Sequence, residues 1–117
     1  MILFLEYPRC STCQKAKKWL LAHGIEFTDR HIVEENPTAE ELKEWAGRSG
    51  LEIKRMFNTS GMKYKELGLK DKLLSMSDEE KFALLASDGM LVKRPLVVTD
   101  NSVLTGFKEK EWEETLL

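Results

Sequence analysis

The pattern of apolar and polar residues divides the chain into three parts, and the first part begins with a strand. Residues 1–6 form an almost continuous apolar run, which is typical of a short buried strand. Residues 11–23 carry apolar side chains at helical spacing, and Gly24 is a natural helix stop. A weaker alternation over residues 25–33 predicts a second strand. Because a helical crossover joins the two strands, we expect them to be parallel neighbours.

The middle part of the chain, residues 36–88, is predicted to be helical. Two capping boxes mark helix starts within it, Thr38 with Glu41 and Ser77 with Glu80. Apolar residues recur with helical spacing after the first of these starts. The middle part therefore adds helices but no strand to the predicted sheet.

The last part of the chain returns to strands and ends in a helix. Residues 96–99 and 102–105 are apolar and β-branched runs on either side of a turn signal, which predicts a β-hairpin. Residues 108–116 predict an amphipathic helix. The order β-α-β, helical block, β-β-α predicts an α/β fold with a mixed sheet, in the arrangement of a thioredoxin-like fold. We expect one domain over residues 1–117, with residues 36–88 as a helical insertion between the second and third strands.

Composition and charge narrow the classes of function. The chain has 117 residues, of which 42% are hydrophobic and 32% charged, and this is enough for one hydrophobic core. Its net charge of −2 gives no basic excess for direct binding to nucleic acid or a membrane surface. No apolar stretch approaches the length of a membrane span, and the opening residues do not resemble a signal peptide. We therefore expect a cytoplasmic protein.

Two cysteines, Cys10 and Cys13, stand where the first predicted strand meets the first predicted helix, and the chain has no others. Ser11 with Gln14 fits a capping box, so we expect the helix to begin there. The unpaired N–H groups and partial positive charge of a helix N-terminus stabilise a thiolate, which is the reactive form of cysteine. We expect the amides of Thr12 and Cys13 to point toward the sulfur of Cys10.

The charges around the two cysteines favour the same chemistry. Four cations lie close in sequence to the pair, without a carboxylate among them: Arg9, Lys15, Lys17 and Lys18. We predict a thiol-redox site in which Cys10 is the nucleophile and Cys13, one turn into the helix and more shielded, is the resolving thiol. The alternative is that both are small, inert core residues. A metal site would need His23 and His31 as further ligands, but the spacing matches no zinc finger or knuckle, so no metal is predicted.

Arg94-Pro95 is the second informative pair, because it precedes the strongest predicted strand of the last part. A proline cannot donate to a sheet ladder and therefore belongs at a strand start. If its peptide bond is cis, the preceding backbone is held against the thiol loop. The Arg94 guanidinium could then bind an anionic substrate or a glutathione carboxylate. The alternative is a surface charge followed by an ordinary strand start.

Four separated motifs carry a family resemblance: YPRCSTC at 7–13, ENPT at 35–38, YKELGL at 64–69 and KRPLVV at 93–98. Together they resemble the glutaredoxin-coupled arsenate reductase family, which includes the Spx-type transcription regulators. The resemblance implies a thioredoxin-like fold with a helical insertion, a reactive Cys10 and an arginine next to a cis proline. The residues expected to bind substrate or shape the site around Cys10, Cys13 and Arg94 are Arg9, Ser11, Thr12, Pro95 and Asn58.

The chain departs from the arsenate reductases of this family at the residues that bind the oxyanion. The resemblance implies three arginines there, and only Arg94 matches, because Asn58 and Gly106 stand at the other two positions. Each lost charge-assisted contact is worth about 1.5–3 kcal/mol, so we expect arsenate to bind weakly. The reductases also carry a serine-type residue where this chain has Cys13, which favours a dithiol reaction.

Two functions remain open at this point. The first is a small thiol-disulfide reductase that acts on a thiol or oxyanion substrate, binds no cofactor, and is restored by glutathione, glutaredoxin or thioredoxin. The second is a redox-sensing regulator, since the Spx-type proteins carry a C-x-x-C that switches on oxidation and bind the α subunit of RNA polymerase.

Overall fold

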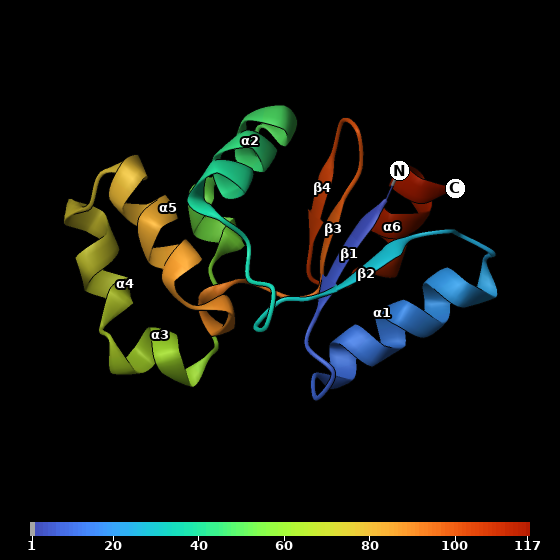
Figure 1. The fold of residues 1–117 in the computed structure, drawn as a ribbon, viewed down its shortest axis with the longest axis horizontal. Coiled ribbons are helices and arrows are strands. Elements are labelled where there is room, and N and C mark those ends of the chain that lie inside the picture. Colours follow the sequence, from blue (N-terminus) through green and yellow to red (C-terminus); the bar gives the residue numbers. More distant parts are fainter. Residues whose placement is uncertain (1) are drawn as a thin grey trace.

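A computed structural model describes residues 2–117, and its centre is a four-stranded mixed sheet (Figure 1). The strands follow the order β2-β1-β3-β4 across the sheet. β1 pairs in parallel with β2 and antiparallel with β3, which pairs antiparallel with β4. Their bounds are β1 Leu3–Glu6, β2 Thr28–His31, β3 Leu96–Val98 and β4 Val103–Thr105. The predicted α/β fold, the parallel pair and the hairpin are confirmed; Met1, part of the predicted first strand, lies outside the described residues.

The second strand is shorter than the prediction over residues 25–33, because its first residues serve other contacts. The Ile25 N–H donates to the carbonyl of Leu20 at 3.0 Å and so closes the preceding helix. The Phe27 ring packs edge-on against Phe4, with the ring centroids 5.4 Å apart. Apolar side chains that suggested a longer strand therefore cover the end of the core instead.

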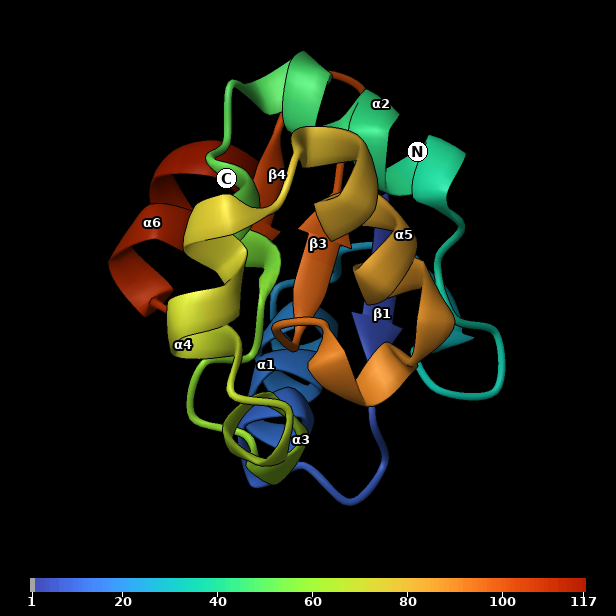
Figure 2. The same ribbon diagram turned by 90° about the vertical axis from the view of Figure 1, so that its left-hand side faces the viewer.

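Helices cover both faces of the sheet. α1 (Ser11–Ala22) and α6 (Glu109–Leu116) lie on one side, and the helices of the middle part lie on the other, as Figures 1 and 2 show. The middle part contains α2 Ala39–Ser49, α3 Met62–Glu66, α4 Leu69–Lys72 and α5 Asp78–Ser87, with short 3-10 turns η1 Ile53–Met56, η2 Leu73–Ser75 and η3 Gly89–Leu91. The capping boxes predicted at Thr38 and Ser77 are both present.

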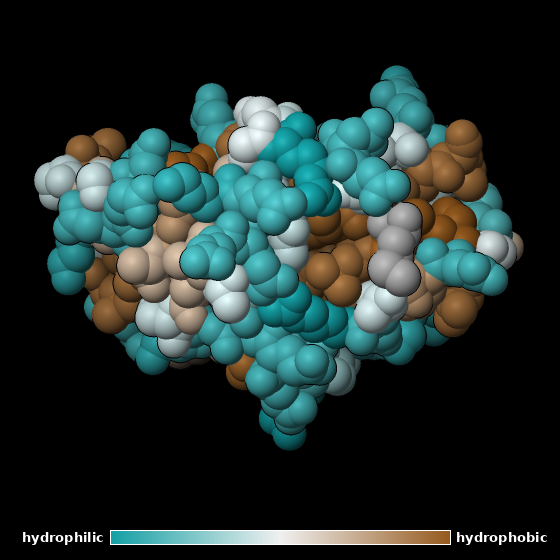
Figure 3. All heavy atoms as spheres, turned by 45° about the horizontal axis from the view of Figure 1, so that its top comes forward, coloured by the Kyte–Doolittle hydropathy of each residue, from teal (hydrophilic) through white to brown (hydrophobic). Residues whose placement is uncertain are grey.

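The alternation of side chains along the strands produces two cores. Phe4 and Val97 point to the side of α1 and α6 and pack with Trp19 and Trp112. Leu5, Leu96 and Val98 point to the opposite face of the sheet and pack against the helices of the middle part. Hydrophilic residues cover much of the outer face drawn in Figure 3, with apolar side chains visible between them. Within residues 2–117, no helix has the length and apolar character needed to cross a membrane.

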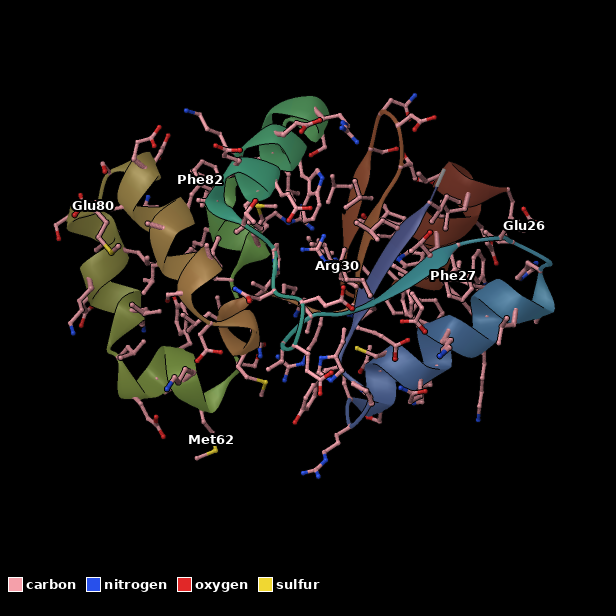
Figure 4. All side chains as sticks on the ribbon, viewed as in Figure 1. Glu26, Phe27, Arg30, Met62, Glu80 and Phe82 are labelled. Carbon is pink, nitrogen blue, oxygen red and sulfur yellow. The ribbon has the colours of Figure 1, made fainter. Side chains whose placement is uncertain are left out.

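One partly buried ion pair connects the middle part to the sheet. Arg30 of β2 lies between the sheet and α2, where Figure 4 labels it. Its guanidinium donates to both carboxylate oxygens of Glu41, at 2.8 and 2.9 Å, and to the carbonyls of Glu35 and Asn36. The hydrogen bonds to Glu41 raise the pKa of Arg30 and lower the pKa of Glu41. The pair therefore positions the start of α2, whose capping box also uses Glu41.

Gly89 marks a second close contact between the middle part and the sheet side. A Cβ atom at this position would lie 2.0 Å from the carbonyl oxygen of Ile32. Only glycine permits this approach, which sets the path of the chain from α5 into the segment before β3.

Candidate active site

The Cys10 sulfur lies at the start of α1 and caps the helix. The backbone of Cys10 is extended, with φ −87° and ψ 115°, and its Sγ accepts the N–H of Cys13 at 3.3 Å. The Cys10 N–H donates to the Tyr7 carbonyl at 2.9 Å, which closes the turn through Pro8. The capping box predicted for Ser11 and Gln14 is therefore wrong, because the residue with cap geometry is Cys10 itself.

Cys13 occupies the opposite kind of environment, one turn further into α1. It is fully buried, whereas Cys10 is partly exposed, and both are free thiols. The pKa of Cys13 is raised from 9.0 to about 12; burial is the largest cause, and the neighbouring Cys10 contributes to the rise. A backbone hydrogen bond from Tyr7 and the charge of Arg94 oppose this rise. The two thiols are thus close together but unequal, with one open to solvent and the other shielded.

Arg94 and Pro95 lie beside the cysteine loop, just before β3. The peptide bond between them is cis, as the family resemblance implied. The guanidinium of Arg94 lies over the ring of Tyr7, 5.4 Å from its centroid, and donates to the Met90 carbonyl at 3.4 Å. Its buried Nε atom has no hydrogen-bond partner within the described residues. This arrangement holds the positive charge of Arg94 near Cys13, where it opposes part of the rise in the pKa of Cys13.

The other predicted site residues fall around this centre. Arg9, Ser11 and Thr12 are exposed at the start of α1, and Pro95 is buried. Asn58 is partly buried, and its backbone N–H donates to the carbonyl of Leu91 at 2.7 Å. Arg94 and Asn58 both line one cleft of about 630 Å³ between the α3 segment and η3. The structure thus brings Asn58 to the side of Arg94 that faces the middle part.

A second cleft, of about 500 Å³, adjoins the cysteine loop on the other side of Arg94, and we call it the basic cleft. It is lined by side chains from segments far apart in the sequence: Thr12, Lys54, Arg55, Lys93, Arg94 and Lys108. Sequence reasoning singled out only Thr12 and Arg94 of these six. The available signals were the adjacent pairs Lys54-Arg55 and Lys93-Arg94, but only the tertiary fold shows that they face one space.

A buried carboxyl group near the loop was also missed. Glu6, the last residue of β1, is 3% exposed; its Oε1 accepts Gln14 Nε2 at 3.1 Å, and its Oε2 has no hydrogen-bond partner within residues 2–117. Lys17 lies 3.4 Å from Glu6 and 2.7 Å from Asp29. Burial, followed by the nearby Asp29 carboxyl group, raises the pKa of Glu6. Lys17, one of the four cations noted near the cysteine pair, is therefore engaged with these carboxyl groups.

The two histidines make separate contacts. The His23 ring packs against Trp19 at an interplanar angle of 49°, with 4.3 Å between centroids, and His31 Nδ1 accepts the N–H groups of Val33 and Glu34. In the part of the chain that the structure describes, no three His, Cys, Asp or Glu side chains are grouped so that they could hold a metal ion.

The sequence matches the model of the ArsC family over residues 5–115. The chain belongs to the ArsC family. This match confirms the resemblance to arsenate reductases and their relatives, and it covers the cysteine loop, the middle helices and the Arg94-Pro95 segment. ArsC membership and the two neighbouring cysteines identify a thiol redox protein with a thioredoxin-like fold.

Similar proteins fall on both the enzyme and the regulator side of the family. A crystal structure of an ArsC-family-related protein from Bacteroides fragilis is 63% identical, covers 97% of this chain and 95% of its own, and superposes with a TM-score of 0.93. An arsenate reductase structure from Vibrio cholerae is 30% identical, with a TM-score of 0.86. The match covers 98% of this chain and 97% of the Vibrio cholerae chain. The regulatory protein MgsR of Bacillus subtilis is 34% identical over 94% of this chain and 86% of its own length.

Proposed function

We propose that this chain is a thiol-disulfide reductase in which Cys10 attacks and Cys13 resolves. The observation that carries the proposal is the unequal pair at the start of α1. The Cys10 sulfur is partly exposed and accepts the Cys13 N–H at 3.3 Å, while the Cys13 thiol is fully buried one turn away. An exposed thiolate at a helix N-terminus is the expected nucleophile of thiol-disulfide exchange.

The proposed reaction has two exchanges. The Cys10 thiolate attacks one sulfur of a substrate disulfide, forms a mixed disulfide, and releases the first thiolate, which takes a proton from water. Cys13 loses its proton and attacks Cys10 Sγ, which releases the second thiolate and leaves a Cys10–Cys13 disulfide. The substrate gains two electrons, and two electrons from glutathione, glutaredoxin or thioredoxin restore both thiols.

The structure supports this order of attack. Two of the causes that raise the pKa of Cys13 are its hydrogen bond and charge interaction with Cys10. Both causes vanish when the Cys10 sulfur becomes part of a mixed disulfide, whereas the charge of Arg94 still favours the Cys13 thiolate. Cys13 therefore becomes easier to deprotonate once its attack is needed. A reducing cytoplasm, where such a pair is kept reduced between turnovers, is the compartment that suits this reaction.

Turnover of a small disulfide tests the proposal. With coenzyme A disulfide as substrate and each of the three reductants in turn, Cys10→Ser is expected to abolish turnover. Cys13→Ser is expected to accumulate a mixed disulfide that intact mass spectrometry detects. Full activity of both variants would refute the assignment of roles. The reductant that supports the fastest turnover identifies the electron source.

A second candidate function is redox regulation, and the similarity to the regulatory protein MgsR favours it. In this alternative, formation of the Cys10–Cys13 disulfide changes the surface around α1 and thereby the affinity for a protein such as the RNA polymerase α subunit. A pull-down with the α subunit, using oxidised and reduced chain, separates the two candidates. Retention in one redox state only supports the regulator, and no retention in either state removes it.

A further inference from the structure

The basic cleft collects positive charge beside the first turn of α1, where Thr12, two residues after the proposed nucleophile, lines it. Lys54 and Arg55 come from η1, Lys93 and Arg94 from the segment before β3, and Lys108 from the start of α6. Among the described residues that line this cleft, none is Asp or Glu, although the chain as a whole carries a net charge of −2. The overall composition therefore conceals a local cationic surface.

These cations are largely unpaired. Lys108 lies 3.8 Å from Glu111, but no carboxylate within residues 2–117 forms an ion pair with Lys54, Arg55 or Lys93. Like charges that share a cleft repel one another unless an anion enters it. The cleft is therefore complementary to a negatively charged ligand.

The size of the cleft indicates what kind of anion fits. Its volume of about 500 Å³ lies within the range of small-molecule sites and far exceeds the ~30 Å³ of a single water molecule. A lone tetrahedral oxyanion would fill a small part of this space. Phe57 and Phe107 provide apolar walls between the cations. These features suit an organic molecule with several separated negative charges.

We infer that the basic cleft selects disulfides of thiols that carry several negative charges, and that Lys54, Arg55 and Lys93 bind these charges while Cys10 attacks the sulfur. The inference rests on the proposed function, because it names the substrate class of the same site. Thr12, in the first turn of α1, lines the cleft and connects it to the cysteine loop. Lys54, Arg55 and Lys93 thus act as specificity-determining residues.

Stoichiometric modification of Cys10 tests this selectivity without requiring turnover. In a Cys13→Ser background, Cys10 is the only thiol, and its rate constant is measured with dithiobis(nitrobenzoate), which carries two carboxylates, and with uncharged dithiodipyridine. Lys54→Gln, Arg55→Gln and Lys93→Gln are each expected to slow the anionic reagent about threefold to fivefold, the effect of one lost exposed charge contact. The uncharged reagent is expected to change less than twofold.

The matched control is Lys72→Gln, which removes the same charge from α4, away from the cleft. It is expected to leave both rates unchanged, and raising the salt from about 50 mM to about 500 mM is expected to slow only the anionic reagent. The inference is overturned if the cleft variants slow both reagents equally, if they slow neither, or if Lys72→Gln has the same effect as they do.

The source of the negative charge is distinguished by turnover of the unsubstituted chain, with thioredoxin as the reductant in every arm. Glutathione disulfide presents carboxylates, coenzyme A disulfide presents phosphates, and cystamine presents ammonium groups. Faster turnover of either anionic disulfide than of cystamine supports the inference and identifies the anion, whereas equal turnover of all three overturns it. Turnover of none, combined with charge-selective modification of Cys10, refutes the proposed reductase and leaves the cleft's selectivity established.

Discussion

Replacing Cys10 with serine leaves Cys13 as the only thiol and exposes the difference between the two cysteines. Burial is the largest of the causes that raise the pKa of Cys13 from 9.0 to about 12, and it persists after the Cys10 sulfur is removed. A rise of three units lowers the thiolate fraction at neutral pH roughly a thousandfold. Limited access to a side chain with 0% exposure slows the reaction further.

The assay is alkylation by iodoacetamide at neutral pH, followed by intact mass spectrometry. Cys13 of folded Cys10→Ser is expected to react at least about a hundredfold more slowly than the same variant unfolded in urea, even if the lost Cys10 contacts return part of the pKa shift. Cys10 of Cys13→Ser serves as the matched control and is expected to react at least as fast in the folded chain as in urea. Equal rates for Cys13 in the folded and unfolded states would refute the reasoning that burial protects it.

Three further predictions concern stability. The pKa of Glu6 is raised above 4.5, so its contribution to the free energy of unfolding is fully present below that pH and is lost as the pH rises. Urea unfolding at about pH 5 and pH 8 should therefore show that Glu6→Gln gains stability relative to the unsubstituted chain at the higher pH. A stability difference that stays constant between the two pH values would contradict this. Gly89→Ala places a Cβ 2.0 Å from the Ile32 carbonyl and should cost about 3 kcal/mol in the same assay, whereas an unchanged midpoint would disprove the close contact. If residues 1–117 form one domain, the fluorescence of Trp45 in one core and Trp112 in the other, isolated by Trp→Phe variants, should report a single coincident unfolding transition, and two separate transitions would argue for independent units.

The order of elements could be predicted from the sequence because it depends on local patterns. The capping boxes at Thr38 and Ser77 combine a side-chain acceptor with a glutamate three residues later, and both form as the pattern indicates. The box predicted at Ser11 has the same pattern and does not form. The turn after Tyr7 places Cys10 at the cap position, and the Gln14 side chain donates to Glu6 and Pro8 instead.

The sequence singles out Cys10, Cys13 and Arg94 as candidate site residues, because two of them form a motif and the third stands next to an informative proline. It does not single out most of the cations that line the basic cleft. The cations of the basic cleft come from three segments, at residues 54–55, 93–94 and 108, and the packing of η1 against the segment before β3 brings the first two together. The burial of Glu6 was missed because a charged residue at the end of an apolar strand is ordinarily exposed.

The most direct test of the redox pair is an equilibrium titration of the unsubstituted chain in glutathione buffers of known potential. Samples are quenched, and intact mass spectrometry gives the fraction that has lost two hydrogens through a Cys10–Cys13 disulfide. We expect one two-electron transition with a midpoint between about −300 and −180 mV, absent from both single serine variants. A chain that stays reduced across this range, or that forms only disulfides between molecules, would contradict a paired nucleophile and resolving thiol.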